Sequence, residues 1–289
     1  MTITFGKSLA IATILGAAIL GTSATTTHAA EGGSLTSKAV VNFITNTDPS
    51  QPIDPEDPDP ENPVNPIDPI DPENPVGPGT DGPLSLDFVP SLNFGTAKIT
   101  TKNEEYSAYA QQIKADATEG TPEIGNYRPN YVQVTDNRGT EAGWTLSVQQ
   151  VKQFASTEQK ELTGAAIQLT DGKLNTVEGS TAQAPTGATE VSLVPEETIN
   201  IVTAAAGQGA GVWANYYGSS ETSLSADTDI VVTENEAGEE EVGSKPVIRN
   251  SAVTLSVPGA SVKTDSTYST ELKWTLAETE SNGGNEGAE

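Results

Sequence analysis

The sequence predicts an all-β fold, an antiparallel β-sandwich or barrel-like domain with one short helix at most, preceded by a disordered linker rich in Asp and Pro. Between Leu84 and Ala277 the chain has many short runs in which apolar and polar residues alternate, the period of a strand with one buried face. Most of these runs are bounded by Gly, Pro, Asn or Asp, which favour turns. Short strands with frequent turns are typical of antiparallel sandwiches and barrels.

Residues 1–30 have the organisation of a signal peptide. Lys7 gives a short positive region, Leu9–Leu20 an apolar stretch, and Thr27–Ala30 a small-residue cleavage site. Cleavage after Ala29 or Ala30 would remove Lys7 and the only histidine, His28. The sequence therefore predicts a secreted protein.

Residues 31–47 contain a short apolar alternation around Ala39–Ile44 and are expected to form one strand. A long linker separates this strand from the rest of the chain. Two arrangements are therefore open, in which the strand pairs with the main domain or stays a flexible tip.

Residues 48–83 form an acidic linker in which proline recurs about every third residue. This is the period of polyproline II, at about 3.1 Å per residue, so the segment could extend over roughly 90 Å. Asp57, Asp59 and Glu61 have some likeness to a calcium loop, but the glycine and distal glutamate of an EF-hand are missing. Solvated charge on a spacer is the better account.

The folded domain is expected to span residues 84–277. Its predicted strands are 84–88, 131–134, 144–148, 166–169, 191–194, 199–202, 230–232, 252–257 and 268–277. Glu104–Ala117 alone has a helix-like composition. Asp136–Gly139 is expected to be a turn, and Glu234–Gly243, with its glutamates, a solvated hairpin loop. Residues 278–289 are expected to form a polar acidic tail.

Composition excludes several classes of function. The formal net charge of −26 and the pI near 4.1 argue against nucleic acid as a partner, because phosphate binding requires clustered Lys and Arg. No apolar run after the signal peptide approaches the roughly 20 residues of a membrane span, so no membrane insertion is expected. The chain has no Cys, and after cleavage it would have no His, which excludes the usual catalytic nucleophile systems and zinc ligands. We expect no enzyme activity, cofactor or metal; a carboxylate glycosidase is the remaining enzymatic alternative.

Two Trp-x-Leu tripeptides stand out within the predicted domain, Trp144-Thr145-Leu146 and Trp274-Thr275-Leu276. The first follows Tyr131–Gly139 and the second ends the run Thr267–Leu276. With the signal peptide and the acidic proline segment, this doubled motif resembles the WxL-domain family of Gram-positive cell-surface proteins. The resemblance extends over residues 84–277.

The resemblance implies a protein that is secreted and held non-covalently on the cell wall. It implies peptidoglycan as the usual ligand, other cell-surface proteins as partners, and no enzyme activity. An alternative is a host-directed adhesin that uses this domain as its anchor and binds matrix protein or mucin.

The candidate wall-contact residues are those of the two motifs: Trp144, Thr145, Leu146, Trp274, Thr275 and Leu276. An exposed indole flanked by hydroxyls suits the apolar faces of a glycan. A tryptophan on an alternating strand can equally be a core residue, so both placements are open. Trp213 is expected to be a core or loop aromatic. Of Tyr216 and Tyr217, one is expected to be exposed.

The negative charge of the chain also indicates which polymer of the cell wall it can bind. Removing Lys7 from the chain takes the formal charge from −26 to −27. Teichoic acids are polyanions and should repel such a chain. Peptidoglycan is therefore the expected receptor.

Overall fold

The computed structural model describes residues 35–73, 76–118, 120–234 and 239–279. The chain divides into two compact units, Met1–Asn42 and Phe43–Glu289. The described residues 35–42 of the first unit form no strand, and their side chains are exposed; residues 43–47 of the second unit also form no strand. The strand predicted within residues 31–47 is therefore wrong for residues 35–47. The predicted signal peptide lies outside the described residues.

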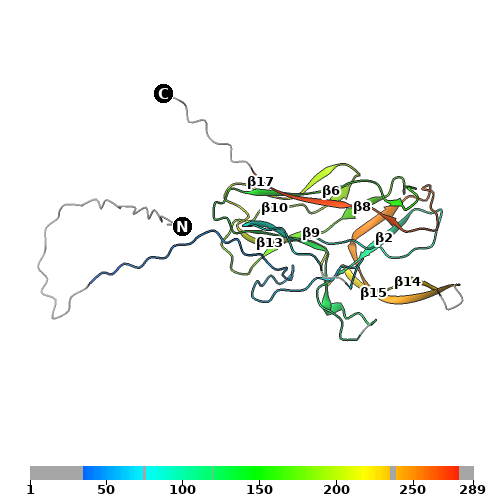
Figure 1. Cartoon of the computed structure of the whole chain (residues 1–289), viewed down its shortest axis with the longest axis horizontal. Coiled ribbons are helices and arrows are strands. Elements are labelled where there is room, and N and C mark those ends of the chain that lie inside the picture. The colour runs from blue at the N-terminus through cyan, green and yellow to red at the C-terminus, as the bar shows by residue number, and fades with distance from the viewer. Residues whose placement is uncertain (1–34, 74–75, 119, 235–238, 280–289) are drawn as a thin grey trace, which may run out of the picture. The chain divides into compact units, whose positions relative to one another are not determined.

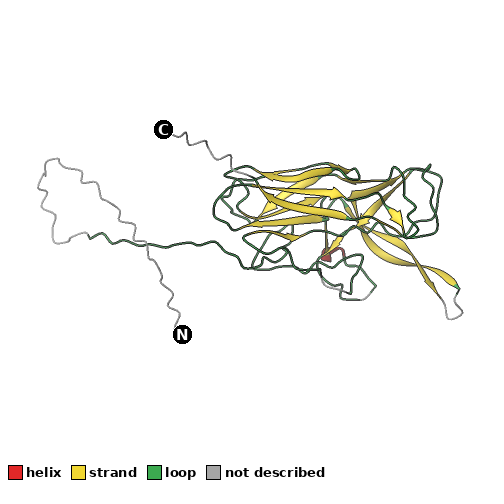
Figure 2. Cartoon of the chain, turned by 45° about the horizontal axis from the view of Figure 1, so that its top comes forward, coloured by secondary structure: helices red, strands yellow, loops and turns green. Residues whose placement is uncertain are grey.

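The second unit is built from antiparallel strands, which confirms the predicted fold class (Figure 2). The strands are β1 (Leu84–Phe88), β2 (Glu104–Tyr109), β3 (Gln111–Gln112), β4 (Tyr127–Arg128), β5 (Tyr131–Asp136), β6 (Trp144–Gln150), β7 (Ala155–Ser156), β8 (Ala166–Leu169), β9 (Gly172–Thr176), β10 (Thr186–Gly187), β11 (Val191–Leu193), β12 (Thr198–Ala204), β13 (Gly211–Tyr217), β14 (Leu224–Glu234), β15 (Glu240–Val257), β16 (Tyr268–Ser269) and β17 (Leu272–Glu278). Within the described residues, the helical structure is a single 3₁₀ turn, Ile124–Asn126.

Three sheets carry most of the strands. Their orders are β1-β5-β13-β9, β10-β12-β6-β17 and β11-β8-β15-β14, and β2 also pairs with β15. In Figure 1, β6 and β17 run side by side along one side of the unit, while β13 and β9 lie below them. The long β14–β15 hairpin projects from the other strands.

Several predicted elements differ in the structure. The run predicted as one strand at 268–277 is divided into β16 and β17, which belong to different sheets. The helix-like run Glu104–Ala117 contains β2 and β3, because β2 pairs with β15 and buries Ala108 completely. Tertiary pairing here outweighs the local propensity. The predicted loop Glu234–Gly243 is shorter than expected, since Glu240–Gly243 belongs to β15 and pairs with β14.

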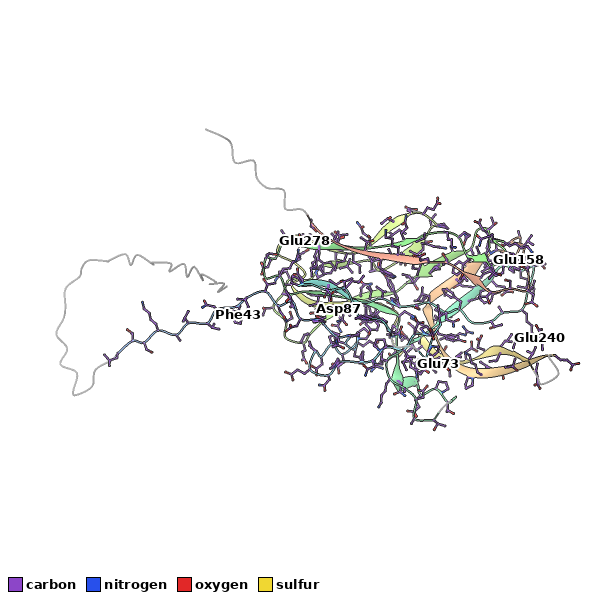
Figure 3. The ribbon with its side chains drawn as sticks, in the orientation of Figure 1. Phe43, Glu73, Asp87, Glu158, Glu240 and Glu278 are labelled. Carbon is purple, nitrogen blue, oxygen red and sulfur yellow. The ribbon has the colours of Figure 1, made fainter. Side chains whose placement is uncertain are left out.

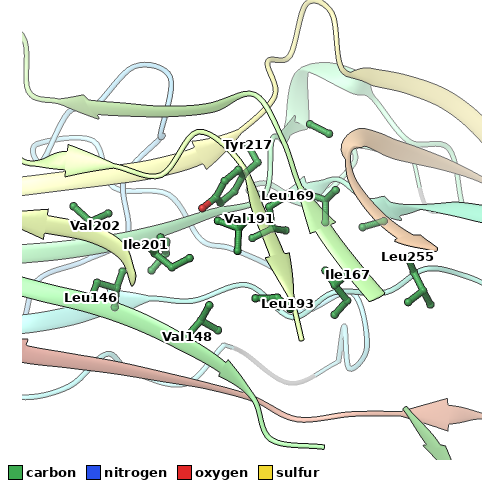
Figure 4. Packing of buried hydrophobic residues seen from close by; sticks show 14 of the residues in the cluster. Leu146, Val148, Ile167, Leu169, Val191, Leu193, Ile201, Val202, Tyr217 and Leu255 are labelled. Atoms are coloured by element: carbon green, nitrogen blue, oxygen red, sulfur yellow. The ribbon is translucent and has the colours of Figure 1, made fainter. Parts of the chain in front are cut away.

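A single large apolar core lies between the sheets. In β6, burial alternates along the strand, and Trp144, Leu146 and Val148 are fully buried. Figure 4 shows Leu146 and Val148 near Ile201 and Val202 of the neighbouring strand β12. The core also contains Trp213 of β13, as the sequence predicted.

The acidic proline segment is not a free linker. All six residues of β5 are buried, although a strand of a simple sandwich is expected to bury one face only. The segment accounts for this, because its Val64 and Val76 pack on a second apolar cluster formed by Phe88, Tyr131 and Ala214 together with Ile113, and its Ile53 is 2% exposed. The prediction of a disordered linker over residues 48–83 is therefore wrong, since the segment covers the outer face of the β1-β5-β13-β9 sheet.

This packing also explains why both tyrosines of β13 are at least partly buried. Tyr217 is buried in the main core, whereas Tyr216 points to the opposite face and packs on the second cluster. Tyr216 is partly buried, so the expectation that one of the two tyrosines is exposed is wrong.

Polar contacts fix the segment in place. The Ile53 N–H donates to the Gln133 side-chain oxygen at 2.8 Å, and Gln133 Nε2 donates to the Gln51 carbonyl at 3.0 Å. The Arg128 guanidinium lies 2.6 Å from the Asp54 carboxylate. These bonds replace the hydration of polar groups that the packing removes from water.

Asp87 is the buried acid of this network (Figure 3). Its carboxylate accepts hydrogen bonds from Ser85 Oγ at 2.5 Å, Thr135 Oγ1 at 2.5 Å and Gln133 Nε2 at 2.8 Å. Burial raises the pKa of the Asp87 carboxyl, and the hydrogen bonds that it accepts oppose this only in part. The folded state therefore holds the proton more tightly than the unfolded state.

A raised pKa at Asp87 predicts a loss of stability as the pH rises. The contribution of this group is fully present below its unfolded pKa and is lost as the pH rises through its folded pKa, with a slope of at most about 1.4 kcal/mol per pH unit. Asn mimics the neutral acid, so Asp87→Asn should gain stability relative to the parent chain as the pH rises above the ordinary Asp pKa of about 3.9. Urea unfolding at several pH values measures this difference; a difference that does not change with pH would contradict the prediction.

Among the described residues, no helix has the length and apolar character needed to cross a membrane.

Candidate functional site

The two Trp-x-Leu motifs lie on neighbouring strands. Strand β17 pairs antiparallel with β6, so that Trp274 stands opposite Val148 and Leu276 opposite Leu146. Residues opposite each other in such a pair project to the same face. The apolar side chains of both motifs are therefore directed to the same side of this sheet.

Trp144 belongs to the core. Its ring is 0% exposed, and its Nε1–H donates to the Gly209 carbonyl at 3.0 Å. Gly209 has φ +76°, and a Cβ there would lie 2.7 Å from the Trp144 Nε1 atom. The glycine thus provides both the acceptor and the space for the indole.

The prediction that Trp144 and Leu146 contact the wall is therefore wrong. Both side chains are 0% exposed, because β6 is an interior strand with β12 on one side and β17 on the other. The alternative placement of these residues in the core is the observed one.

Trp274 and Leu276 have a different environment, since β17 is the last strand of its sheet. Both side chains pack against the main core but keep part of their surface in solvent. Of the two tryptophans in the motifs, only Trp274 can therefore be reached from outside.

The accessible parts of Trp274 and Leu276 line a surface groove of about 410 Å³. Its other walls come from the start of β1 and the residues before it, from Arg138 in the turn after β5, and from Glu278 at the end of β17. The lining residues are Thr80, Asp81, Gly82, Pro83, Leu84, Leu86, Arg138, Trp274, Leu276 and Glu278. The groove thus lies between β1 and β17, each the last strand of its sheet, and its lining combines apolar with polar side chains.

Arg138 forms hydrogen bonds that link the β5–β6 turn to the end of β17 beside the groove. Its guanidinium donates to both Asp136 carboxylate oxygens, at 2.9 and 2.7 Å, and to the Gly143 carbonyl at 2.9 Å. It also donates to Glu278 Oε1 at 2.9 Å. The bonds to Asp136 are the main reason why the pKa of Arg138 is raised above its ordinary value. The predicted turn at Asp136–Gly139 is thereby linked to the last residues of β17.

The folded domain extends beyond its predicted end at residue 277. Glu278 is the last residue of β17, where Figure 3 labels it, and the N–H of Thr279 donates to the Gly143 carbonyl. The predicted acidic tail at 278–289 therefore begins after Thr279 at the earliest, and residues 280–289 lie outside the described part of the chain.

The two threonines of the motifs do not reach the groove. Thr275 is exposed and Thr145 partly buried, and each alternates with the inward-facing residues of its strand. They lie on the outer face of the sheet. The six predicted residues are thus split among the core, the groove and the opposite face.

Sequence reasoning missed Arg138, residues 80–84 and Leu86 as parts of the groove. Pairing of β1 with β5, which brings Leu84 opposite Asp136, places these residues there, and pairing partners cannot be read from one sequence. Within the described ranges, no group of three or more His, Cys, Asp or Glu side chains is placed to hold a metal ion.

A family model described as WxL domain surface cell wall-binding matches residues 30–279. The chain belongs to this family. The WxL match covers the docked acidic segment as well as the strands, and it places the protein among cell wall-binding domains of the cell surface. Searches of curated proteins and of solved structures found no significant match.

Proposed function

We propose that this WxL protein is secreted and attaches non-covalently to the cell wall by binding peptidoglycan in the groove beside β17. The observation that carries the proposal is the accessibility of Trp274 and Leu276 in that groove, next to a Trp144 that is fully buried. The buried motif supports the strand on which the accessible motif is presented.

The groove has the character of a carbohydrate site. The indole of Trp274 offers an apolar face for sugar C–H groups and loses little conformational entropy when fixed. Thr80, Asp81 and Glu278 at the rim offer hydroxyl and carboxylate acceptors for sugar hydroxyls. An apolar floor with a few polar groups is the usual composition of a small-ligand site.

Charge favours peptidoglycan over teichoic acid. Asp81 and Glu278 line the groove, and the only cation among its lining residues, Arg138, is 7% exposed at its side chain and paired with Asp136 and Glu278. A polyanion would meet a site with more carboxylates than cations, whereas glycan hydroxyls would meet hydrogen-bond acceptors.

We propose further that the domain binds without catalysis. Glu278 is 67% exposed at its side chain and is ion-paired with Arg138, whereas the acid of a glycosidase must be held protonated by its surroundings. Other cell-surface proteins remain expected partners. The host-directed adhesin stays a prediction for which no face of the domain can be named.

Sedimentation with purified sacculi tests the proposed receptor. We expect the folded chain to pellet with sacculi stripped of teichoic acid at least as well as with untreated ones. Binding should stay constant or strengthen as salt rises, because salt screens repulsion between like charges. Loss of binding after stripping, or a steep loss in salt, would contradict peptidoglycan as the receptor.

A further inference from the structure

Residues 35–44, which precede the docked acidic segment, are unusually apolar for a stretch that is exposed. Five large apolar side chains are exposed within ten residues: Leu35, Val40, Val41, Phe43 and Ile44. Segments that remain unpaired in solution are normally poor in such residues. A dense group of exposed apolar side chains indicates a surface that another molecule covers.

Strand β17 has an unpaired backbone edge to which such a segment could add. The Val151 N–H donates to the Glu271 carbonyl, and the Thr279 N–H donates to the Gly143 carbonyl, so the odd-numbered residues make the hydrogen bonds toward β6. Because the bonded side alternates along an antiparallel strand, the backbone groups of Trp274 and Leu276 face away from β6. No strand in the described part of the chain pairs with that side. An open edge of this kind accepts an added strand.

The groove beside this edge suits the side chains of an added strand. Leu84 and Leu86 line it from β1, and Trp274 and Leu276 line it from β17. The edge of β1 itself is partly occupied, because the Thr80 N–H donates to the Leu86 carbonyl and the Leu86 N–H to Thr80 Oγ1. The free backbone edge is therefore that of β17.

We propose that residues 38–44 of one copy add as a strand to β17 of a second copy, with alternate apolar side chains entering the groove. Since the added strand and peptidoglycan would both occupy the groove at Trp274, the two contacts compete for it. Val41 and Phe43 share one face of such a strand. The chain's own groove does not cover Phe43 and Ile44, which belong to the same unit as the groove and are 89% and 92% exposed. They stay exposed even though the next residue, Thr45, donates a hydrogen bond from Oγ1 to the carbonyl of Arg138, which lines the groove.

Charge supports a second copy as the occupant. Residues 35–47 carry one lysine, Lys38, and no acid, whereas the whole chain has 40 acidic and 14 basic residues. The segment is therefore the part of the chain that an acidic copy repels least. Each copy has one segment that adds and one β17 edge that is open to it. The contact is therefore head-to-tail and would generate open chains of copies.

Sedimentation velocity of the chain starting at Glu31, without wall material, tests this contact independently of wall binding. We expect concentration-dependent oligomers, and about tenfold or more weaker association in the double variant Val41→Asp, Phe43→Asp. Asn42→Asp with Asn46→Asp is the matched control, because it adds the same charge outside the proposed apolar face and should associate far better. A chain that stays monomeric at all concentrations, or a control that dissociates equally, would overturn the proposal.

Single cysteines identify the partner surfaces, since the chain has none of its own. A mixture of Val41→Cys and Leu276→Cys chains, treated with a short bismaleimide, should give a covalent dimer that contains one of each. A chain with both cysteines should link mainly to other chains. If it links within itself and remains a monomer, the segment fills its own groove and the proposal is wrong.

Discussion

Replacing Trp144 with Ala is expected to lower the free energy of unfolding by about 3–5 kcal/mol, the usual cost of removing a large buried aromatic side chain. Trp144 is 0% exposed, and the substitution would also leave the Gly209 carbonyl without its indole donor. Since whole domains are stable by only about 5–15 kcal/mol, much of the stability would be lost. Urea denaturation followed by far-UV circular dichroism measures the change.

Trp274→Ala is the matched control, because it removes the same side chain from the corresponding motif. Trp274 is only partly buried on an edge strand, so its loss should cost about 1 kcal/mol. Equal destabilisation by the two substitutions would show that the rings have similar environments and would contradict the core placement of Trp144.

Arg138→Ala is the second substitution with a large expected effect. It would leave the Asp136 carboxylate, 2% exposed at its side chain, without its bidentate partner. Removing one member of a buried ion pair typically costs about 3–5 kcal/mol, because the other charge stays buried. The change is measured by urea unfolding at neutral pH, and it should persist at high salt because buried pairs are weakly screened.

Glu278→Gln gives the comparison for Arg138. It removes the other ion pair of the same guanidinium, but the Glu278 side chain is 67% exposed. Exposed pairs contribute about 0–1 kcal/mol. If Glu278→Gln destabilised the domain as much as Arg138→Ala, the tie to β17, and not the buried pair, would be the main contribution of Arg138.

Most strands are predictable because their pattern is local. Alternation in Trp144–Val148 and Tyr268–Ala277 reflects one buried face, and this is a property of successive residues. Strand β2 cannot be predicted in this way, because Glu104–Tyr109 is held as a strand by its pairing with residues of β15 that lie 140 or more positions later in the sequence. Such long-range pairing has no local signature.

The acidic segment differs from its prediction for a similar reason. Its proline period and its charge are typical of a solvated spacer. The residues that dock it, Ile53, Val64 and Val76, are single apolar residues that each follow a proline and precede Asp, Asn or Gly. Their burial depends on a complementary apolar face on β1, β5 and β13, which only the assembled sheet provides.

The candidate site is predictable only in part, because two of the six motif residues, Trp274 and Leu276, line the groove, whereas Arg138 and the residues before β1 carry no local signal. The doubled motif correctly indicates two strands of interest, yet the two tryptophans are equivalent in sequence. Strand order separates them, because β6 is interior and β17 is the edge. Which strand lies at an edge follows from the pairing of the whole sheet, so no local pattern could assign the core and surface roles.

The central claim is that the accessible motif residue in the groove makes the contact with the wall. Its most direct test is the binding of folded Trp274→Ala and Thr275→Ala chains to purified sacculi, since these neighbours on β17 lie on opposite faces of the sheet. We expect Trp274→Ala to bind about tenfold or more weakly, and Thr275→Ala to bind like the parent chain. Unchanged binding by Trp274→Ala, or an equal loss in Thr275→Ala, would contradict the claim.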